Sequence, residues 1–163
     1  MSVISTSTRH FLVETGYWMA SGGDEDFERF VGDAFAGTDS ALIDVSKGGG
    51  LMAVATSTQW SEIEVTATIY DSEPSPEAKP WDAVSDVTIL VDPPGPEDEE
   101  SCIGIMAGPV PEDEPDPIFL PCPTSRHARW HLRIHARVPD SGVEEHLLVF
   151  WPASDSAAHF RGA

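Results

Sequence analysis

Three histidines near the end of the sequence are spaced so that a metal site or a pH-sensitive pair has to be considered. His131 and His135 belong to a stretch in which apolar residues alternate with charged ones, so both should lie on the polar face of one strand. His146 falls in the following apolar stretch and is expected opposite His135. Residues four apart on a strand are separated by about 13 Å, which is too far for two ligands of one zinc ion. We therefore predict no metal site and a solvated or salt-bridged polar face, with a pH-sensitive pair of His135 and His146 as an alternative.

Four of the nine basic residues of the chain gather around these histidines, at Arg126, Arg129, Arg133 and Arg137. In a chain whose net charge is -19, this clustering makes the charge distribution dipolar. Exposed arginines commonly form solvated ion pairs, so pairing with acids such as Glu144 is favoured over an anion-binding surface. Arg133 and Arg137 are nevertheless kept, with the three histidines, as candidates for a ligand-binding or pH-sensitive site.

The sequence carries no recognisable catalytic or cofactor signature. Serine and histidine occur, but no GxSxG nucleophile elbow does. Cys102 has no catalytic residues around it and Cys122 stands between two prolines, so both are predicted to be free structural thiols. The triple glycine at 48–50 lacks the Lys and the Ser or Thr that complete a phosphate-binding loop, and is interpreted as a turn. We therefore predict a protein that is not an enzyme and has no cofactor.

The histidines and arginines lie mainly on the first strand of a predicted antiparallel hairpin. Its strands are residues 129–137 and 145–151, and its turn is Pro139-Asp140-Ser141-Gly142. The register that gathers the large apolar groups on one face pairs Ile134 with Leu147, Leu132 with Val149 and Trp130 with Trp151. This register predicts all six side chains in the core, and it also sets His135 opposite His146.

Short strands separated by turns are predicted along the rest of the chain. Residues 62–70 alternate most clearly, and residues 42–45 and 51–55 should form a hairpin around the glycine turn. A kinked strand over 9–20, strands over 86–91 and 102–106, and a short helix within 24–35 complete the assignment. Because strands and helices do not alternate regularly, the predicted fold class is mostly β: an antiparallel β-sandwich or open barrel with at most one or two short helices.

Length and hydropathy set the expected domain organisation. The 163 residues suffice for one core, so residues 1–163 are expected to form a single domain. The N-terminal residues do not have the basic and apolar segments of a signal peptide, and no window has membrane-spanning length. We therefore expect a cytoplasmic protein that does not contact membranes.

Acidic, proline-rich loops are predicted around residues 92–117, where Lys and Arg do not occur. The candidate partner-binding residues within them are Glu97, Asp98, Glu99, Glu100, Glu112, Asp113 and Glu114. Only nine basic residues are available to contact phosphates, so nucleic acid is excluded as a partner and a basic protein is favoured. The alternative is that these acids only keep the protein soluble.

Three segments of the sequence carry a resemblance to known proteins. They are Trp81-Asp82-Ala83-Val84, residues 132–137 (Leu-Arg-Ile-His-Ala-Arg), and residues 144–153, which close on Trp-Pro-Ala. The pattern resembles a group of small acidic actinobacterial proteins and, more distantly, is similar to the competence protein J family of nuclease inhibitors. Here Val138-Pro139-Asp140 replaces the Gly-Arg-Asp turn of the group. The resemblance implies an acidic β protein that inhibits a partner.

The predicted function is accordingly a non-catalytic inhibitor or immunity-type protein that binds a basic partner such as a nuclease or toxin. One alternative is a ligand- or metal-binding β domain that uses the hairpin carrying His135 and His146. Another is a structural or regulatory interaction module.

Overall fold

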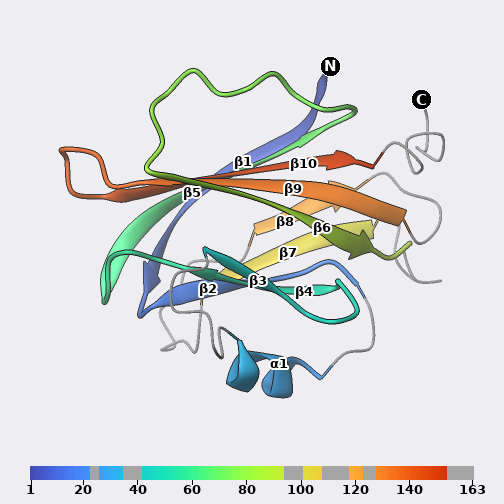
Figure 1. Cartoon of the computed structure of the whole chain (residues 1–163), viewed down its shortest axis with the longest axis horizontal. Helices are drawn as coiled ribbons and strands as arrows, with labels where there is room; N and C mark the ends of the chain where they lie inside the picture. Colours follow the sequence, from blue (N-terminus) through green and yellow to red (C-terminus); the bar gives the residue numbers. More distant parts are fainter. Residues whose placement is uncertain (23–25, 35–41, 94–100, 108–117, 123–127, 154–163) are drawn as a thin grey trace.

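Ten strands form two five-stranded sheets that pack face to face in the described part of the computed structural model (Figure 1). The structure describes residues 1–22, 26–34, 42–93, 101–107, 118–122 and 128–153. The first sheet has the order β1 (Val3–Val13), β5 (Ser61–Tyr70), β10 (Glu144–Pro152), β9 (Ala128–Arg137) and β6 (Ala83–Val91). The second has the order β3 (Ile43–Val45), β4 (Leu51–Ala55), β2 (Gly16–Ala20), β7 (Ser101–Ala107) and β8 (Ile118–Cys122). The predicted fold class is thus confirmed as a β-sandwich.

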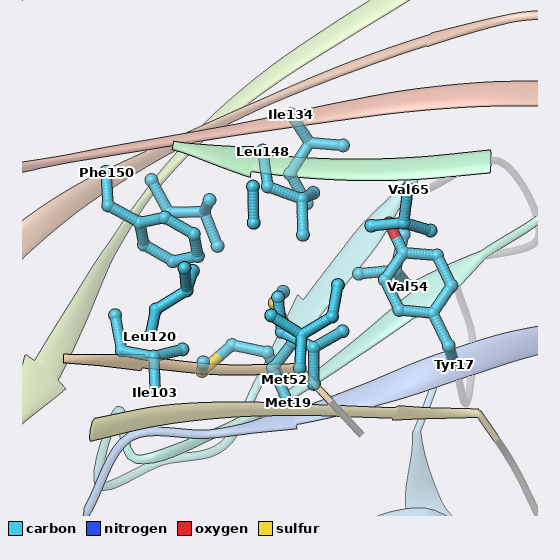
Figure 2. Packing of buried hydrophobic residues seen from close by; sticks show 14 of the residues in the cluster. Tyr17, Met19, Met52, Val54, Val65, Ile103, Leu120, Ile134, Leu148 and Phe150 are labelled. Carbon is cyan, nitrogen blue, oxygen red and sulfur yellow. The ribbon is translucent and has the colours of Figure 1, made fainter. Parts of the chain in front are cut away.

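The core lies between the two sheets. Figure 2 shows Ile134, Leu148 and Phe150 of the first sheet projecting toward Met19 and Met52 of the second. The strand predicted over 62–70 is β5, and its alternating apolar residues Ile63, Val65, Ala67 and Ile69 are all fully buried. Because the other face of β5 carries polar residues, the alternation of apolar and polar residues predicted its buried face correctly. All pairings between neighbouring strands are antiparallel except that of β5 with β10, which is parallel.

The kinked strand predicted over 9–20 is two strands in different sheets. β1 ends at Val13, the chain turns at Glu14 and Thr15, and β2 starts at Gly16 in the second sheet. A side chain at Gly16 would collide with the carbonyl oxygen of Val54, so a glycine is needed where β2 meets β4. The sequence showed the break, but it gave no sign that the chain changes sheets there.

The β9–β10 hairpin and its turn at Pro139–Gly142 are present, but the predicted register is wrong by one residue. Ile134 pairs with Leu148 and Leu132 with Phe150, while Leu147 pairs with His135. The core face of β10 therefore carries His146, Leu148 and Phe150, and the outer face carries Leu147, Val149 and Trp151. All residues from 148 to 152 are buried, so the apolar pattern did not distinguish the two faces.

The remaining predicted elements are present, the strand over 51–55 with the predicted bounds and the others with shifted ones, and one strand was missed. The short helix is α1 (Phe27–Asp33), which starts behind Asp26, whose carboxylate accepts a hydrogen bond from the Arg29 amide at 3.2 Å. The strand over 118–122 was not predicted because Pro121 interrupts it. β8 lies at the edge of its sheet, where a residue without an N–H group is tolerated.

Candidate functional site

A chain of buried hydrogen bonds joins the two sheets. The Tyr17 hydroxyl of β2 lies 2.8 Å from Nδ1 of His146 in β10, and Nε2 of His146 lies 2.7 Å from Oε1 of Glu144. Glu144 and His146 are two residues apart on β10, so both point to the core face, in line with Leu148 and Phe150. The ionised carboxylate only accepts hydrogen bonds, so Nε2 of His146 donates to it, and in the neutral imidazole Nδ1 then accepts from Tyr17.

The same carboxylate holds the loop between β4 and β5, residues 56–60, against the end of the sandwich. Oε1 of Glu144 accepts from the Ser57 amide at 3.0 Å, and Oε2 accepts from the Thr58 amide at 2.9 Å and the Thr58 hydroxyl at 2.8 Å. Glu144 thus receives three hydrogen bonds from the loop in addition to the one from His146. We call Tyr17, His146 and Glu144 the buried triad.

Burial and hydrogen bonding act on the acidity of the triad in opposite directions. Burial raises the pKa of Glu144, but the hydrogen bonds from His146, the amides of Ser57 and Thr58 and the Thr58 hydroxyl outweigh it and lower that pKa to about 2. For Tyr17, burial and the nearby Glu144 carboxylate raise the pKa well above its usual value. The carboxylate therefore stays ionised and the phenol stays protonated at neutral pH.

The buried triad is closed to a substrate. The side chains of His146 and Glu144 are 0% and 1% exposed, and Tyr17 is fully buried. Every polar atom of the three side chains has a hydrogen-bond partner. The arrangement therefore ties β2, β10 and the 56–60 loop together rather than positioning a reactive group.

These contacts correct two inferences made from the sequence. His146 does not face His135: it pairs with Ala136 in the ladder and lies on the opposite face of the sheet. Glu144 forms hydrogen bonds with His146 and the 56–60 loop, whereas Arg133 and Arg137 form ion pairs with other carboxylates. The sequence signal for the triad was weak, because a Glu and a His two apart, with the charged Glu145 between them, are equally typical of a solvated strand face.

The other candidates described by the structure lie together on the outer face of the first sheet, against two tryptophans: His131, His135, Arg133 and Arg137. The Arg133 guanidinium lies 5.0 Å from the ring centre of Trp151, and that of Arg137 lies 5.2 Å from the ring centre of Trp81. The ring of His131 is tilted against that of Trp151 with 5.2 Å between ring centres, and the ring of His135 against that of Trp81 with 5.3 Å. Trp151 is buried here, as predicted, but outside the core between the sheets.

Carboxylates neutralise both arginines on this face. Nε of Arg133 lies 2.7 Å from Asp86 on β6, and Nε of Arg137 lies 2.7 Å from Glu145 on β10. Glu73 lies 3.6 Å from Arg133 as a second partner. The arginines thus form internal ion pairs, in agreement with the interpretation favoured from the sequence but with different partners.

The outer face offers little room for a small ligand. The segment between β5 and β6 passes over it (Figure 1), and a hollow of about 10 Å³ is left between Pro74, Glu77, Arg133 and His135. Such a hollow holds no more than about one water molecule. Burial lowers the pKa of His135, although a hydrogen bond to the Leu147 carbonyl opposes this effect. Among the described residues no three His, Cys, Asp or Glu side chains gather as metal ligands would.

A larger hollow of about 540 Å³ lies between α1 and the β3–β4 hairpin. Its charged lining is mixed, with Asp26 and Asp44 beside Arg29 and Lys47. Among the described residues that line it, acidic and basic side chains are thus equally represented, and none of them is a candidate residue.

Three further predictions from the sequence concern the acidic loops, the cysteines and membrane-spanning segments. The acidic candidates Glu97, Asp98, Glu99, Glu100, Glu112, Asp113 and Glu114 lie outside the described residues. Cys102 pairs with Pro121 and Cys122 with Ser101, so the cysteines occupy neighbouring strands. No helix in the described ranges is long and apolar enough to cross a membrane.

The architecture of the chain is that of a two-sheet β-sandwich shared, over nearly its full length, with solved structures. One is ComJ from Bacillus subtilis, an inhibitor of the DNA degrading activity of NucA: the TM-score is 0.59 at 7% identity, over 94% of this chain and 100% of ComJ. A second is the crocagin biosynthetic gene J protein, with a TM-score of 0.58 at 11% identity, over 93% of this chain and 99% of that one. No protein-family model and no curated protein matches the sequence. At these identities the likeness establishes a common fold.

Proposed function

We propose that this protein is a non-catalytic inhibitor that binds a basic protein partner such as a nuclease or a toxin. The observation that carries the proposal is the likeness to ComJ, which extends over 94% of this chain and all of ComJ. The likeness therefore includes the whole sandwich. Fold likeness alone does not transfer a function, so the charge and the site chemistry have to agree with it.

The charge of the chain supports a basic partner. The net charge is -19, with 28 acidic and 9 basic residues. Two of the basic side chains, Arg133 and Arg137, are already paired with carboxylates of the same molecule. The remaining acidic excess attracts a positively charged cleft and accelerates association with it.

The chemistry of the described residues supports binding rather than turnover. The buried triad brings three titratable side chains into hydrogen-bond contact, but solvent does not reach it. His131 and His135 lie against tryptophan rings, and the hollow beside His135 has no room for a substrate. A surface that binds a macromolecule needs neither a pocket nor a nucleophile.

The test begins with affinity capture from cells that make the protein, at low and at high salt. The captured proteins are identified by mass spectrometry, and the basic ones are purified with their activity assayed. We expect one of them to lose its activity in proportion to added inhibitor, with complete loss near one equivalent. If no basic protein is captured at low salt, or if captured enzymes keep full activity at excess inhibitor, the proposal is wrong.

A further inference from the structure

Trp60 is a large apolar side chain presented to solvent. It is 73% exposed, and among the described residues other than glycine it is the one with a positive φ, of 52°. Bulky residues rarely adopt this left-handed conformation, because it costs about 1 to 3 kcal/mol of backbone strain. The strain and the exposed indole are both unfavourable for the isolated molecule, so neither is explained by its folding.

The loop that carries Trp60 is held rigid. Three hydrogen bonds from residues 57 and 58 reach Glu144 of the buried triad. At the ends of the loop, the Thr56 amide donates to the Thr15 carbonyl at 3.1 Å and the Trp60 amide to the Glu14 carbonyl at 3.0 Å. The backbone beneath the indole is therefore fixed before any partner arrives, which lowers the entropic cost of binding.

Other exposed apolar residues lie at the same end of the sandwich. Leu12 is 56% exposed and pairs with Glu62 where β1 ends beside the start of β5 (Figure 1). Val143, which is 37% exposed, directly precedes Glu144, the first residue of β10 to pair with β5. Phe11, Ile63 and Glu144 point inward, so Leu12 and Glu62 lie on the outer face. This end of the molecule thus combines Trp60 with smaller apolar groups.

Acidic side chains flank the apolar residues. Glu14 is exposed and adjoins the Trp60 backbone, and the side chain of Glu62 is 61% exposed. His10 lies 2.7 Å from Glu62 on the side away from the loop. An apolar centre with a charged rim is the usual organisation of a protein–protein interface, and tryptophan is among the commonest anchors at such centres.

We propose that Trp60 is the anchor through which this protein binds its basic partner. The indole enters an apolar pocket of the partner, and Glu14 and Glu62 face Lys or Arg residues at the rim of that pocket. This inference rests on the proposed inhibitory function and names the surface that performs it. A second copy of this chain is the less favoured occupant, because each copy carries a net charge of -19.

The test uses Trp60→Ala with Phe119→Ala as the matched control. Phe119 is a large apolar residue on β8 that is 63% exposed, so both variants remove a similar exposed ring from different places. With the purified partner, calorimetry should show a Kd at least about 30-fold weaker for Trp60→Ala and within about two-fold for Phe119→Ala. Melting temperatures of both variants should stay close to that of the parent protein, which separates lost contact from lost folding.

The outcomes distinguish this inference from the proposed function. If the parent protein inhibits a basic partner and Trp60→Ala binds that partner equally well, the anchor is wrong and the inhibitory function stands. If the parent protein binds no basic partner, both are wrong. Sedimentation velocity of the parent protein alone should show a monomer, and a dimer that Trp60→Ala dissociates would identify a second copy as the occupant and overturn the inference.

Discussion

Nε2 of His146 lies 2.7 Å from Oε1 of Glu144, and both side chains are closed to solvent between the two sheets. Through this contact, Tyr17 in the second sheet is linked to the 56–60 loop, which connects β4 to β5. Buried polar groups stabilise a fold only while all of them have partners. Removing one member of the triad therefore leaves another without its hydrogen bond and lowers the free energy of unfolding.

Replacing His146 by Phe should therefore be strongly destabilising, although the ring volume is nearly kept. The change leaves the Tyr17 hydroxyl without its partner and removes one donor from the Glu144 carboxylate, which should lower the free energy of unfolding by about 2 to 4 kcal/mol. Urea denaturation followed by circular dichroism measures it. Tyr17→Phe is the comparison: it leaves Nδ1 of His146 without its donor but keeps every donor to Glu144, so it should lose less, about 1 kcal/mol. Equal losses in both variants would contradict the role of His146 as a donor to Glu144.

Acid should weaken the fold through Glu144. Its pKa in the folded protein is about 2, below the usual 4.5, so the unfolded chain takes up the proton first as pH falls. The stability that Glu144 contributes is present above pH 4.5 and is lost as pH falls from 4.5 toward 2, by about 3 kcal/mol at most. Denaturation curves at pH 6, 4 and 3 measure this loss. Glu144→Gln should be less stable at pH 6 and should lose less on acidification; an unchanged acid response would contradict the shifted pKa.

Zinc should not stabilise the protein. His135 and His146 lie on opposite faces of the sheet, so their imidazoles cannot share one ion. We expect no stoichiometric zinc or iron by elemental analysis, and no rise in melting temperature when zinc is added. One metal per chain that disappears from the double variant His135→Ala/His146→Ala would contradict this prediction.

The structure explains which features could be predicted from the sequence. β5 has a polar outer face, so its apolar alternation identified the buried side correctly. β10 is buried on both faces from 148 to 152, so the choice of face depended on pairing with β5, whose residues lie about 80 positions earlier, and a local pattern carries no such information. The triad was missed for the same reason, because the burial of Glu144 depends on Tyr17 and on residues 57 and 58.

Trp151 and Trp60, which differ most in exposure, test the packing of the outer face of the first sheet. Trp151 is 6% exposed and contacts His131 and Arg133, whereas Trp60 is 73% exposed. Trp151→Ala should lower the free energy of unfolding by about 3 kcal/mol or more, and Trp60→Ala by less than about 0.5 kcal/mol. Urea denaturation of both variants decides it. A mild effect at Trp151 would mean that the outer face of the first sheet is not packed as described.

Reversing charge in the acidic segment tests how the partner is attracted. The first set changes Glu97, Asp98, Glu99 and Glu100 to Lys, and the second changes Glu112, Asp113 and Glu114 to Lys. Opposite charges accelerate the encounter of two proteins, and salt screens them, so the first set should slow association by about ten-fold or more at low salt and weaken its salt dependence. Because the sequence predicts these acids in exposed loops, where charges contribute little to folding, the melting temperature should change far less. Stopped-flow association with the captured partner at several salt concentrations measures the rate, and the second set shows whether the two segments act alike.

If neither set alters the rate or its salt dependence, these acids serve solubility only. Attraction of the partner then has to come from carboxylates elsewhere, such as Glu14 and Glu62 beside Trp60.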